Sequence, residues 1–510
     1  MKIIMIILSG VLIFMISCTK MEDPKVYSIL TNTNAFQTKN DAVAAINGIY
    51  ARLKVPSGIS DAWMYYAGFQ TITTDLTTDI GQSDGGTDVE NMSNCLWAPS
   101  NQYIANAWQH KYKMIFDANS AIYYVSQMTT LTDAEKAQFT SEAKFLRSLG
   151  YLDLTDEFGP VIHMTDEDIA NNIADPNYEA QLMTTSVEDI NLAIIADLEY
   201  AAANLPVNYE EHTIYPTTDV GRASKGGALS LLMRLYMRDR NWTKVVEVTD
   251  QIMALNEYAL YPSYSGLFKE FNVWCEENIF NAMANNVVDG VEIMNHFGPV
   301  NHPVVTDRWG WIGVTWYFYD QMEATDDRKQ MFFIDYDGTD GLKYIQPLPG
   351  QPDPPEGTNY MPYAYTKKYA DPEGSTTYYD GHGFPIMRYA EVLLARAEAL
   401  NELNGPNTES IDLINQVKGR SHATLLGDAS GFTKDSLRDA ILLERGFEFF
   451  FECKRRADLI RMDKYETTVN AYLTSKGLEP TIQMPRDKYF SYPQKQVDLN
   501  PNLDNSDRRP

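Results

Sequence analysis

Cysteine is scarce in this sequence, and the few cysteines it has are far apart. Cys18, Cys95, Cys275 and Cys453 are scattered over 510 residues. This spacing offers neither a disulfide framework nor a zinc site of the C-x-x-C type. We interpret the last three as buried thiols.

Positive charge is also in short supply. The 42 Lys and Arg residues face 69 Asp and Glu residues, which gives a formal net charge of -27. A protein this acidic repels a duplex phosphate backbone over almost its whole surface. The composition therefore excludes nucleic acid as a partner.

Motifs for metals, phosphates and nucleophilic catalysis are missing. The sequence contains no H-E-x-x-H, G-x-S-x-G, P-loop or G-x-G-x-x-G pattern. His296 and His302 share a Pro-flanked loop, and we interpret them as ordinary surface or core residues. The run that starts at Asp335 resembles a calcium loop only loosely, because Asp340 stands where an EF-hand has glycine and Gln346 where it has glutamate. We predict no metal and no cofactor.

Long hydrophobic runs are limited to residues 3–16, which are too few to span a bilayer. With Lys2 before it, this run predicts a signal peptide over residues 1–17. Ser17 and Cys18 resemble the lipobox of bacterial lipoproteins, so we expect Cys18 to be acylated and residues 18–36 to form a polar tether. The alternative is an ordinary secreted protein with a chance cysteine.

Helical periodicity dominates from residue 37 onward and predicts a mostly α protein. Short turns join some of these helices into pairs, which favours a degenerate array of tetratricopeptide-type helix pairs. We expect helices over residues 40–53, 107–125 and 133–158, and helix pairs over residues 222–238 with 242–255 and 387–401 with 409–420.

Residues 256–385 lack this periodicity and are rich in Pro, Gly and aromatic residues, which predicts a loop-rich insertion with short strands. The body, residues 37–510, would then consist of a helical part (37–255), the insertion and a C-terminal helical part (386–510). Three of the eight tryptophans crowd into residues 309–316. If residues 308–312 are extended, Trp309 and Trp311 share one face.

Several blocks of this sequence resemble the SusD/RagB family of outer-membrane nutrient-uptake lipoproteins. The C-terminal blocks are FPIMRYAEVLLARAEALNELNG, IDLINQVKGRSHA, AILLERGFEFFFECKRRADLIRMDKY and YFSYPQKQVDLNPNL. The internal blocks EAKFLRSLGYLDLTDEFGPV, GRASKGGALSLLMRLYMRDRNW and GWIGVTWYFYDQMEATDDR follow the family's order. The resemblance covers most of the chain.

This resemblance implies a mostly α SusD-like fold with four tetratricopeptide-like helix pairs. It implies a lipid-anchored protein on the outward face of the outer membrane that takes part in polysaccharide utilisation. Such a protein binds a glycan and delivers it to a partner TonB-dependent, SusC-like channel, without catalysis. The alternatives are a tetratricopeptide-type scaffold that binds only protein and, third, a glycoside hydrolase.

A stripe of glutamates at i, i+4 spacing starts at Glu444. Like charges at this spacing repel unless basic residues compensate them. We therefore expect an ion-pair network between the C-terminal helices, with a catalytic carboxylate cluster as the alternative. Its predicted members are Arg388, Glu391, Glu398, Glu444, Arg445, Glu448, Glu452 and Arg455.

Aromatic side chains on loops suit a sugar ligand, since their faces stack on the C–H faces of sugar rings while polar side chains bind the hydroxyls. The loops at residues 75–103 and 309–316 combine both kinds of residue. Each tryptophan has burial in the core as its alternative. The predicted glycan-binding residues are Trp97, Trp309, Trp311, Trp316, Asp75, Asp84, Asn91 and Asn94.

Overall fold

The structure, a computed structural model of the chain, describes residues 36–53, 65–175, 178, 181–210, 214–215, 221–269, 272–283, 293–306, 308–369, 381 and 383–509. The predicted signal peptide, Cys18 and nearly all of the tether lie outside these residues.

The N-terminal part is built from long helices with well-defined starts. Thr38 caps α2 in a capping box with Asp41, so this helix begins before the Asn40 that the sequence suggested. Thr132 caps α6 in the same way, and the helix ends at Gly159, where φ is 69°. The long helices of this part are α2 (Lys39–Ala51), α5 (Gln102–Gln127), α6 (Asp133–Phe158) and α8 (Val187–Asn204).

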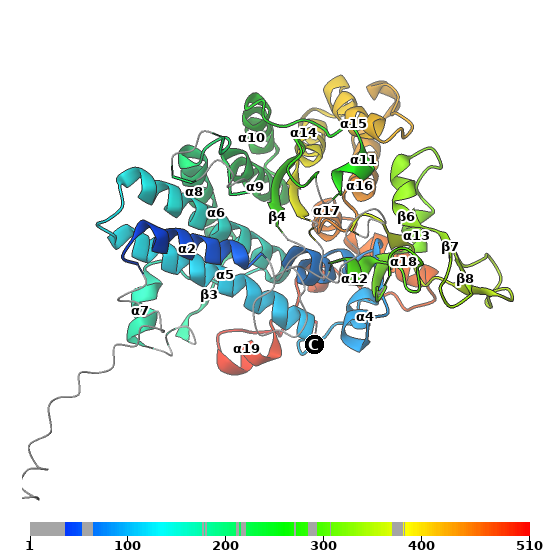
Figure 1. Ribbon diagram of the computed structural model, residues 1–510, viewed down its shortest axis with the longest axis horizontal. Helices are drawn as coiled ribbons and strands as arrows, with labels where there is room; N and C mark the ends of the chain where they lie inside the picture. Colours follow the sequence, from blue (N-terminus) through cyan, green and yellow to red (C-terminus); the bar gives the residue numbers. More distant parts are fainter. Residues whose placement is uncertain are drawn as a thin grey trace, which may run out of the picture.

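Successive helices pack side by side into one array, as the sequence predicts (Figure 1). Along the array α5 contacts α6, α6 contacts α8, α8 contacts α9, α9 contacts α10, and α10 contacts α14, which then packs on α15 and α16. The fold is therefore mostly α. The later helices of the array are α9 (Lys225–Arg238), α10 (Trp242–Ala254), α14 (Tyr389–Asn404), α15 (Thr408–Arg420) and α16 (Lys434–Phe449).

Shorter helices connect the array. They are α3 (Thr71–Thr73), α4 (Thr87–Ser93), α7 (Asp168–Ala174), α11 (Tyr264–Leu267), α12 (Ile293–Phe297), α13 (Trp316–Tyr319), α17 (Arg455–Arg461), α18 (Tyr465–Ser475) and α19 (Gln494–Leu499). Single turns of π- or 3₁₀-helix occur at η1 (Tyr65–Gln70), η2 (Asp75–Thr77), η5 (Asp327–Met331), η6 (Ala429–Gly431) and η7 (Arg486–Lys488).

Most of the described strands lie between residues 278 and 388. β4 and β11 pair antiparallel and hold the two ends of this segment together. β7, β8 and β9 form a small sheet that projects at the right of Figure 1. The strands are β1 (Gly81–Ser83), β2 (Val161–Ile162), β3 (Thr184–Thr185), β4 (Asn278–Ala282), β5 (Ile312–Val314), β6 (Phe332–Phe333), β7 (Asp335–Asp337), β8 (Lys343–Ile345), β9 (Thr358–Tyr360), β10 (Tyr365–Thr366) and β11 (Phe384–Arg388).

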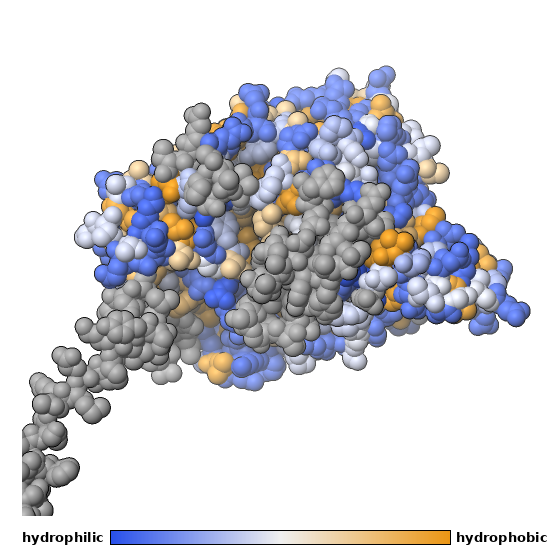
Figure 2. Space-filling view, in the orientation of Figure 1, coloured by the Kyte–Doolittle hydropathy of each residue, from blue (hydrophilic) through white to orange (hydrophobic). Residues whose placement is uncertain are grey.

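The described residues form two hydrophobic cores. The larger one runs through the helix array and includes side chains from α2 to Leu503, near the C-terminus. The smaller one lies in the strand-rich segment and is made mainly of tyrosines, among them Tyr336, Tyr344 and Tyr363. On the face shown in Figure 2 the described surface is mostly hydrophilic, with hydrophobic residues dispersed over it.

Candidate functional site

Two loops that the sequence marks separately meet in a short sheet. β1 pairs antiparallel with β5, in the register Gly81 opposite Val314 and Ser83 opposite Ile312. The carbonyl of Ile80 also accepts a hydrogen bond from the Thr315 N–H. The residues that follow β1 and those that precede β5 therefore lie at the same end of this sheet.

Trp309 and Trp311 pack against each other at that end, with their ring planes tilted by 35°. Their ring centroids are 5.0 Å apart, both side chains are half-buried, and the buried ring of His296 contacts both of them at 4.9 and 5.2 Å. We call these three residues the aromatic platform. The two indoles do lie together, but the backbone between them is not simply extended, because Gly310 has a φ of 59°.

Gly85 provides the space for the platform. A Cβ atom at this position would lie 2.9 Å from Cγ of Trp311, closer than side-chain atoms tolerate, so only glycine fits without moving the ring. The neighbouring Asp84 is exposed, and its Oδ1 accepts a hydrogen bond from the Tyr363 hydroxyl at 2.6 Å. Asp84 thus presents a carboxylate beside the aromatic platform.

Tyr363 is a site residue that the sequence did not reveal. Its hydroxyl lies 2.6 Å from Asp84 and 2.5 Å from the carbonyl oxygen of Gly310, so it joins the two loops. Burial raises the pKa of Tyr363 well above its usual value, and the Asp84 charge adds to this effect. The tyrosine therefore stays protonated and donates. The sequence did not reveal Tyr363 because it lies far along the chain from the two tryptophans.

Two of the predicted glycan-binding residues are wrong. Trp97 is only 1% exposed, and it packs edge-on against Phe490 with the Arg509 guanidinium 4.3 Å above its ring. Asp75 is fully buried and accepts backbone hydrogen bonds from Cys453 and Arg455. Both belong to the interior because the C-terminal segment folds back over the loop that carries them.

The other predicted residues are half-buried or exposed, and two of them, Trp316 and Asn94, use polar atoms in hydrogen bonds within the protein. Trp316 is half-buried, and its indole N–H donates to the carbonyl of Met361 at 3.0 Å. Asn94 accepts from the Lys476 ammonium at 2.7 Å, and Asn91 is half-buried in α4. Of the eight residues, the structure brings Asp84, Trp309 and Trp311 together.

The predicted charged residues are all buried, and each of them forms an ion pair. Arg388 lies at the centre, 2.8 Å from Glu448 and 2.7 Å from Glu452, and it also pairs with Glu277. Burial by itself would raise the pKa of Glu448, but Arg420, Arg388 and Arg328 outweigh burial and hold this pKa well below its usual value. Glu448 is therefore permanently ionised.

The network reaches well beyond the C-terminal helices, where the sequence placed it. Five of its described partners come from earlier in the chain, because its members face the strand-rich segment, α9 and the residues after η2 as well as their own helices. These partners are Asp79, Arg234, Glu277, Arg328 and Lys368. The pairs are Arg234 with Glu391, Arg328 with Glu444, Asp79 with Arg455, Asp458 with Arg445, and Arg461 with Glu398.

Two further observations concern metal binding and membrane crossing. In the described part of the chain, no group of three or more His, Cys, Asp or Glu side chains is arranged to hold a metal ion. Among the described helices, none combines the length and the apolar character that crossing a membrane requires.

The helix pairs and the strand-rich segment together make a SusD-like fold. The solved structure of a SusD-like carbohydrate-binding protein from Bacteroides fragilis is similar to it with a TM-score of 0.76, at 21% identity, over 92% of this chain and 99% of that one. Surface glycan-binding protein A from Bacteroides thetaiotaomicron, solved in complex with laminarihexaose, has a TM-score of 0.71 at 20% identity, over 91% of this chain and 98% of that one.

Sequence models agree with the structural likeness. The model of the SusD family matches residues 306–507, and the model described as starch-binding, associating with the outer membrane, matches residues 33–237. The chain is therefore SusD-like in both its N-terminal and its C-terminal part. A curated relative, SusD-like protein P25 from Formosa agariphila, is 24% identical over 491 residues, which cover 90% of each protein.

Proposed function

We propose that this protein is a glycan-binding lipoprotein of the outer cell surface. It captures an oligo- or polysaccharide on the aromatic platform and delivers it to a partner TonB-dependent, SusC-like channel. The observation that carries the proposal is the pair of half-buried indoles of Trp309 and Trp311 in contact with each other, with the exposed Asp84 carboxylate beside them.

The chemistry of this arrangement suits a sugar. The indole faces offer apolar surface for the C–H groups of a sugar ring, and a carboxylate accepts hydrogen bonds from its hydroxyls. The solved relative with bound laminarihexaose supports the same class of ligand. Because a shallow site gains little from each contact, we expect micromolar to millimolar affinity, which suits a protein that must release its ligand.

Two glutamates of the charged network are unsuited to acid catalysis. A glycosidase needs one carboxyl group that holds a proton at working pH and another that does not. Arg388 and Lys368 hold the pKa of Glu452 below its usual value despite its burial, and Glu448 is held low in the same way. Neither glutamate is available as a general acid.

Glycan arrays and calorimetry test the proposal, using a soluble form that lacks residues 1–18, with laminarihexaose and starch oligosaccharides as first probes. Trp309→Ala and Trp311→Ala should each weaken binding about tenfold, with melting temperatures within a few degrees of the wild type. Trp274→Ala is the matched control, because Trp274 is 45% exposed and lies outside the platform.

Three outcomes would contradict this proposal. Full glycan binding by both platform variants would show that the glycan does not bind at the platform. Failure to bind any glycan on the array would instead favour the protein-binding scaffold. Release of reducing ends from a bound glycan by the wild type would show catalysis.

The lipid anchor is tested separately. If Cys18 is acylated, Cys18→Ala should fractionate with the soluble proteins and incorporate no labelled fatty acid, since each buried CH₂ contributes about 0.8 kcal/mol to anchoring. A variant that still sediments with membranes in high salt would contradict acylation at this residue.

A further inference from the structure

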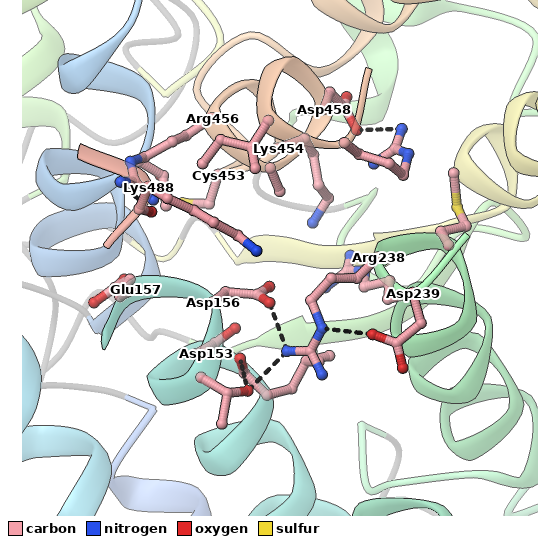
Figure 3. A pocket seen from close by; sticks show the side chains of 18 of the residues that line it. Asp153, Asp156, Glu157, Arg238, Asp239, Cys453, Lys454, Arg456, Asp458 and Lys488 are labelled. Carbon is pink, nitrogen blue, oxygen red and sulfur yellow. Dashed lines mark hydrogen bonds and ion pairs between the residues drawn. The ribbon is translucent and has the colours of Figure 1, made fainter. Parts of the chain in front are cut away.

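A cavity of about 350 Å³ lies apart from the aromatic platform and shares no lining residue with it. Its walls come from the C-terminal turns of α6 and α9, from α17 with the residues before it, and from the loop at residues 484–489 (Figure 3). The exposed ion pair of Arg240 and Asp463 stands at its rim. Charged side chains dominate the lining, and they differ in how far their charges are compensated.

The acidic residues of the α6 wall already have partners. Glu157 forms a buried ion pair with Lys111 at 2.6 Å, and Asp156 pairs with Arg238 at 2.6 Å. Asp153 accepts hydrogen bonds from two buried tyrosine hydroxyls. This wall therefore has little negative charge left to offer a cation.

The opposite wall carries basic groups whose hydrogen-bonding capacity is only partly used. Arg456 is 3% exposed; it donates to two backbone carbonyls and lies over the rings of Tyr465 and Phe490, but its Nε has no hydrogen-bond partner among the described residues. Arg445 is 2% exposed and pairs with Asp458 through its Nε, but none of the described residues is a partner of its Nη1. Lys488 forms no ion pair with any described residue. The Lys454 ammonium donates to the carbonyl of Ile386 at 2.8 Å, and its closest carboxylate oxygen, on Glu391, is 4.0 Å away.

The Nε of Arg456 and the Nη1 of Arg445 are buried donors without a partner in the described part of the chain, and such donors call for an acceptor. A buried polar group without a hydrogen bond is destabilising, and native proteins leave few of them. Burial lowers the pKa of Lys454, and the like charge of Arg234 lowers it further, against the opposing effect of Glu391. In Figure 3 the side chains of Lys454 and Lys488 both point into the cavity.

The volume adds a second constraint. A water molecule occupies about 30 Å³ of the liquid, and sites for small organic ligands begin near 300 Å³. The cavity is therefore larger than an inorganic anion needs. We propose that it binds a small organic anion: a carboxylate, sulfate or phosphate group that faces Lys454, Arg456 and Lys488, carried on a polar molecule of about the size of a sugar.

Calorimetric titration of the soluble protein tests this inference with D-glucuronate, D-glucose 6-sulfate, D-glucose 6-phosphate, sodium sulfate and D-glucose. At least one of the three organic anions should bind, and D-glucose should bind at least tenfold more weakly than that anion. Lys488→Gln should weaken anion binding about ten- to a hundredfold, because a charge-assisted hydrogen bond is lost. The three organic anions distinguish the charged groups from one another.

Two control variants make the result specific. Lys343→Gln removes an exposed lysine of β8 and should leave anion binding unchanged. Trp311→Ala should also leave it unchanged, which separates this cavity from the platform and from the proposed glycan site. Melting curves of each variant show whether it is folded, and the wild-type titrations test the inference even if a variant is not.

Several results would overturn it. Binding of none of the organic anions would do so, as would binding of D-glucose as tight as that of the best anion. Sulfate that binds as tightly as the organic anions would show that the organic part of the ligand contributes nothing to binding in the cavity. Binding that survives Lys488→Gln but is lost in Trp311→Ala would move the anion to the platform.

Discussion

The aromatic platform and the charged network differ in how far solvent and ligands can reach their side chains. Trp309 and Trp311 are half-buried on loops that a two-stranded sheet holds in place. Arg388, Glu448 and Glu452 are buried between helices and strands, with every charge paired. The platform leaves apolar surface uncovered where a ligand can reach it, whereas Arg388, Glu448 and Glu452 hold their charges in the interior.

This difference indicates which residues of the chain serve stability and which serve binding. The network joins segments from Asp79 to Arg461, so it ties the helix array to the strand-rich segment. The platform depends on a few local contacts, above all Gly85 beneath Trp311. Changes in the network should therefore act on folding, and changes in the platform on binding.

The largest expected effect comes from breaking the network. Glu448→Ala leaves the charges of Arg388, Arg420 and Arg328 only partly compensated, which should lower the free energy of unfolding by about 3 to 5 kcal/mol. Thermal and urea denaturation measure this loss.

The matched control for this change is Glu247→Ala, which removes an exposed partner of Lys244 and should change stability by less than about 1 kcal/mol. Equal stability of Glu448→Ala and the wild type, together with lost glycan binding, would show that the network takes part in binding and does not stabilise the fold.

A smaller effect on stability is expected from a buried carboxyl group that has no ion-pair partner among the described residues. Burial raises the pKa of Asp153 to about 6, whereas Arg234 and Lys454 overcome burial at Glu391 and bring its pKa to about 2. The folded protein therefore holds a proton on Asp153 between about pH 4 and 6 that the unfolded chain has released. Its contribution to stability is lost as the pH rises through this window.

Asp153→Asn should remove this dependence. The variant should be more stable than the wild type by on the order of 2 kcal/mol at pH 8, and the difference should vanish near pH 4. The asparagine carbonyl can still accept from the hydroxyls of Tyr65 and Tyr66. Denaturation curves at a series of pH values measure the difference, and a constant offset at every pH would refute the assignment.

The smallest change in stability is expected at the platform. Gly85→Ala places a methyl group against Trp311, which must move and should weaken glycan binding severalfold while stability falls by about 1 kcal/mol. Gly427→Ala is the control, because nothing lies within 4 Å of its added Cβ. Calorimetry and melting curves compare the two, and unchanged binding by Gly85→Ala would show that the ring position is not critical.

The sequence predicted the helices of this fold well, because their signals are local. The boundaries of α6 agree with the expected residues 133–158, since its capping threonine and its terminal glycine are both visible in the chain. The aromatic density at residues 309–316 likewise marked the platform. Trp97 and Asp75 were assigned wrongly, because nothing near them shows that residues from Cys453 onward cover them.

The sequence by itself determined the helical periodicity, the acidic composition, the aromatic cluster and the glutamate stripe. Only the tertiary structure decided which tryptophans stay accessible and which residues complete each group, such as Tyr363 at the platform and Arg328 in the network. The physical reason is the range of the interactions. Capping and periodicity act within a few residues, whereas burial and ion pairing depend on segments hundreds of residues away, which come together only when the chain folds.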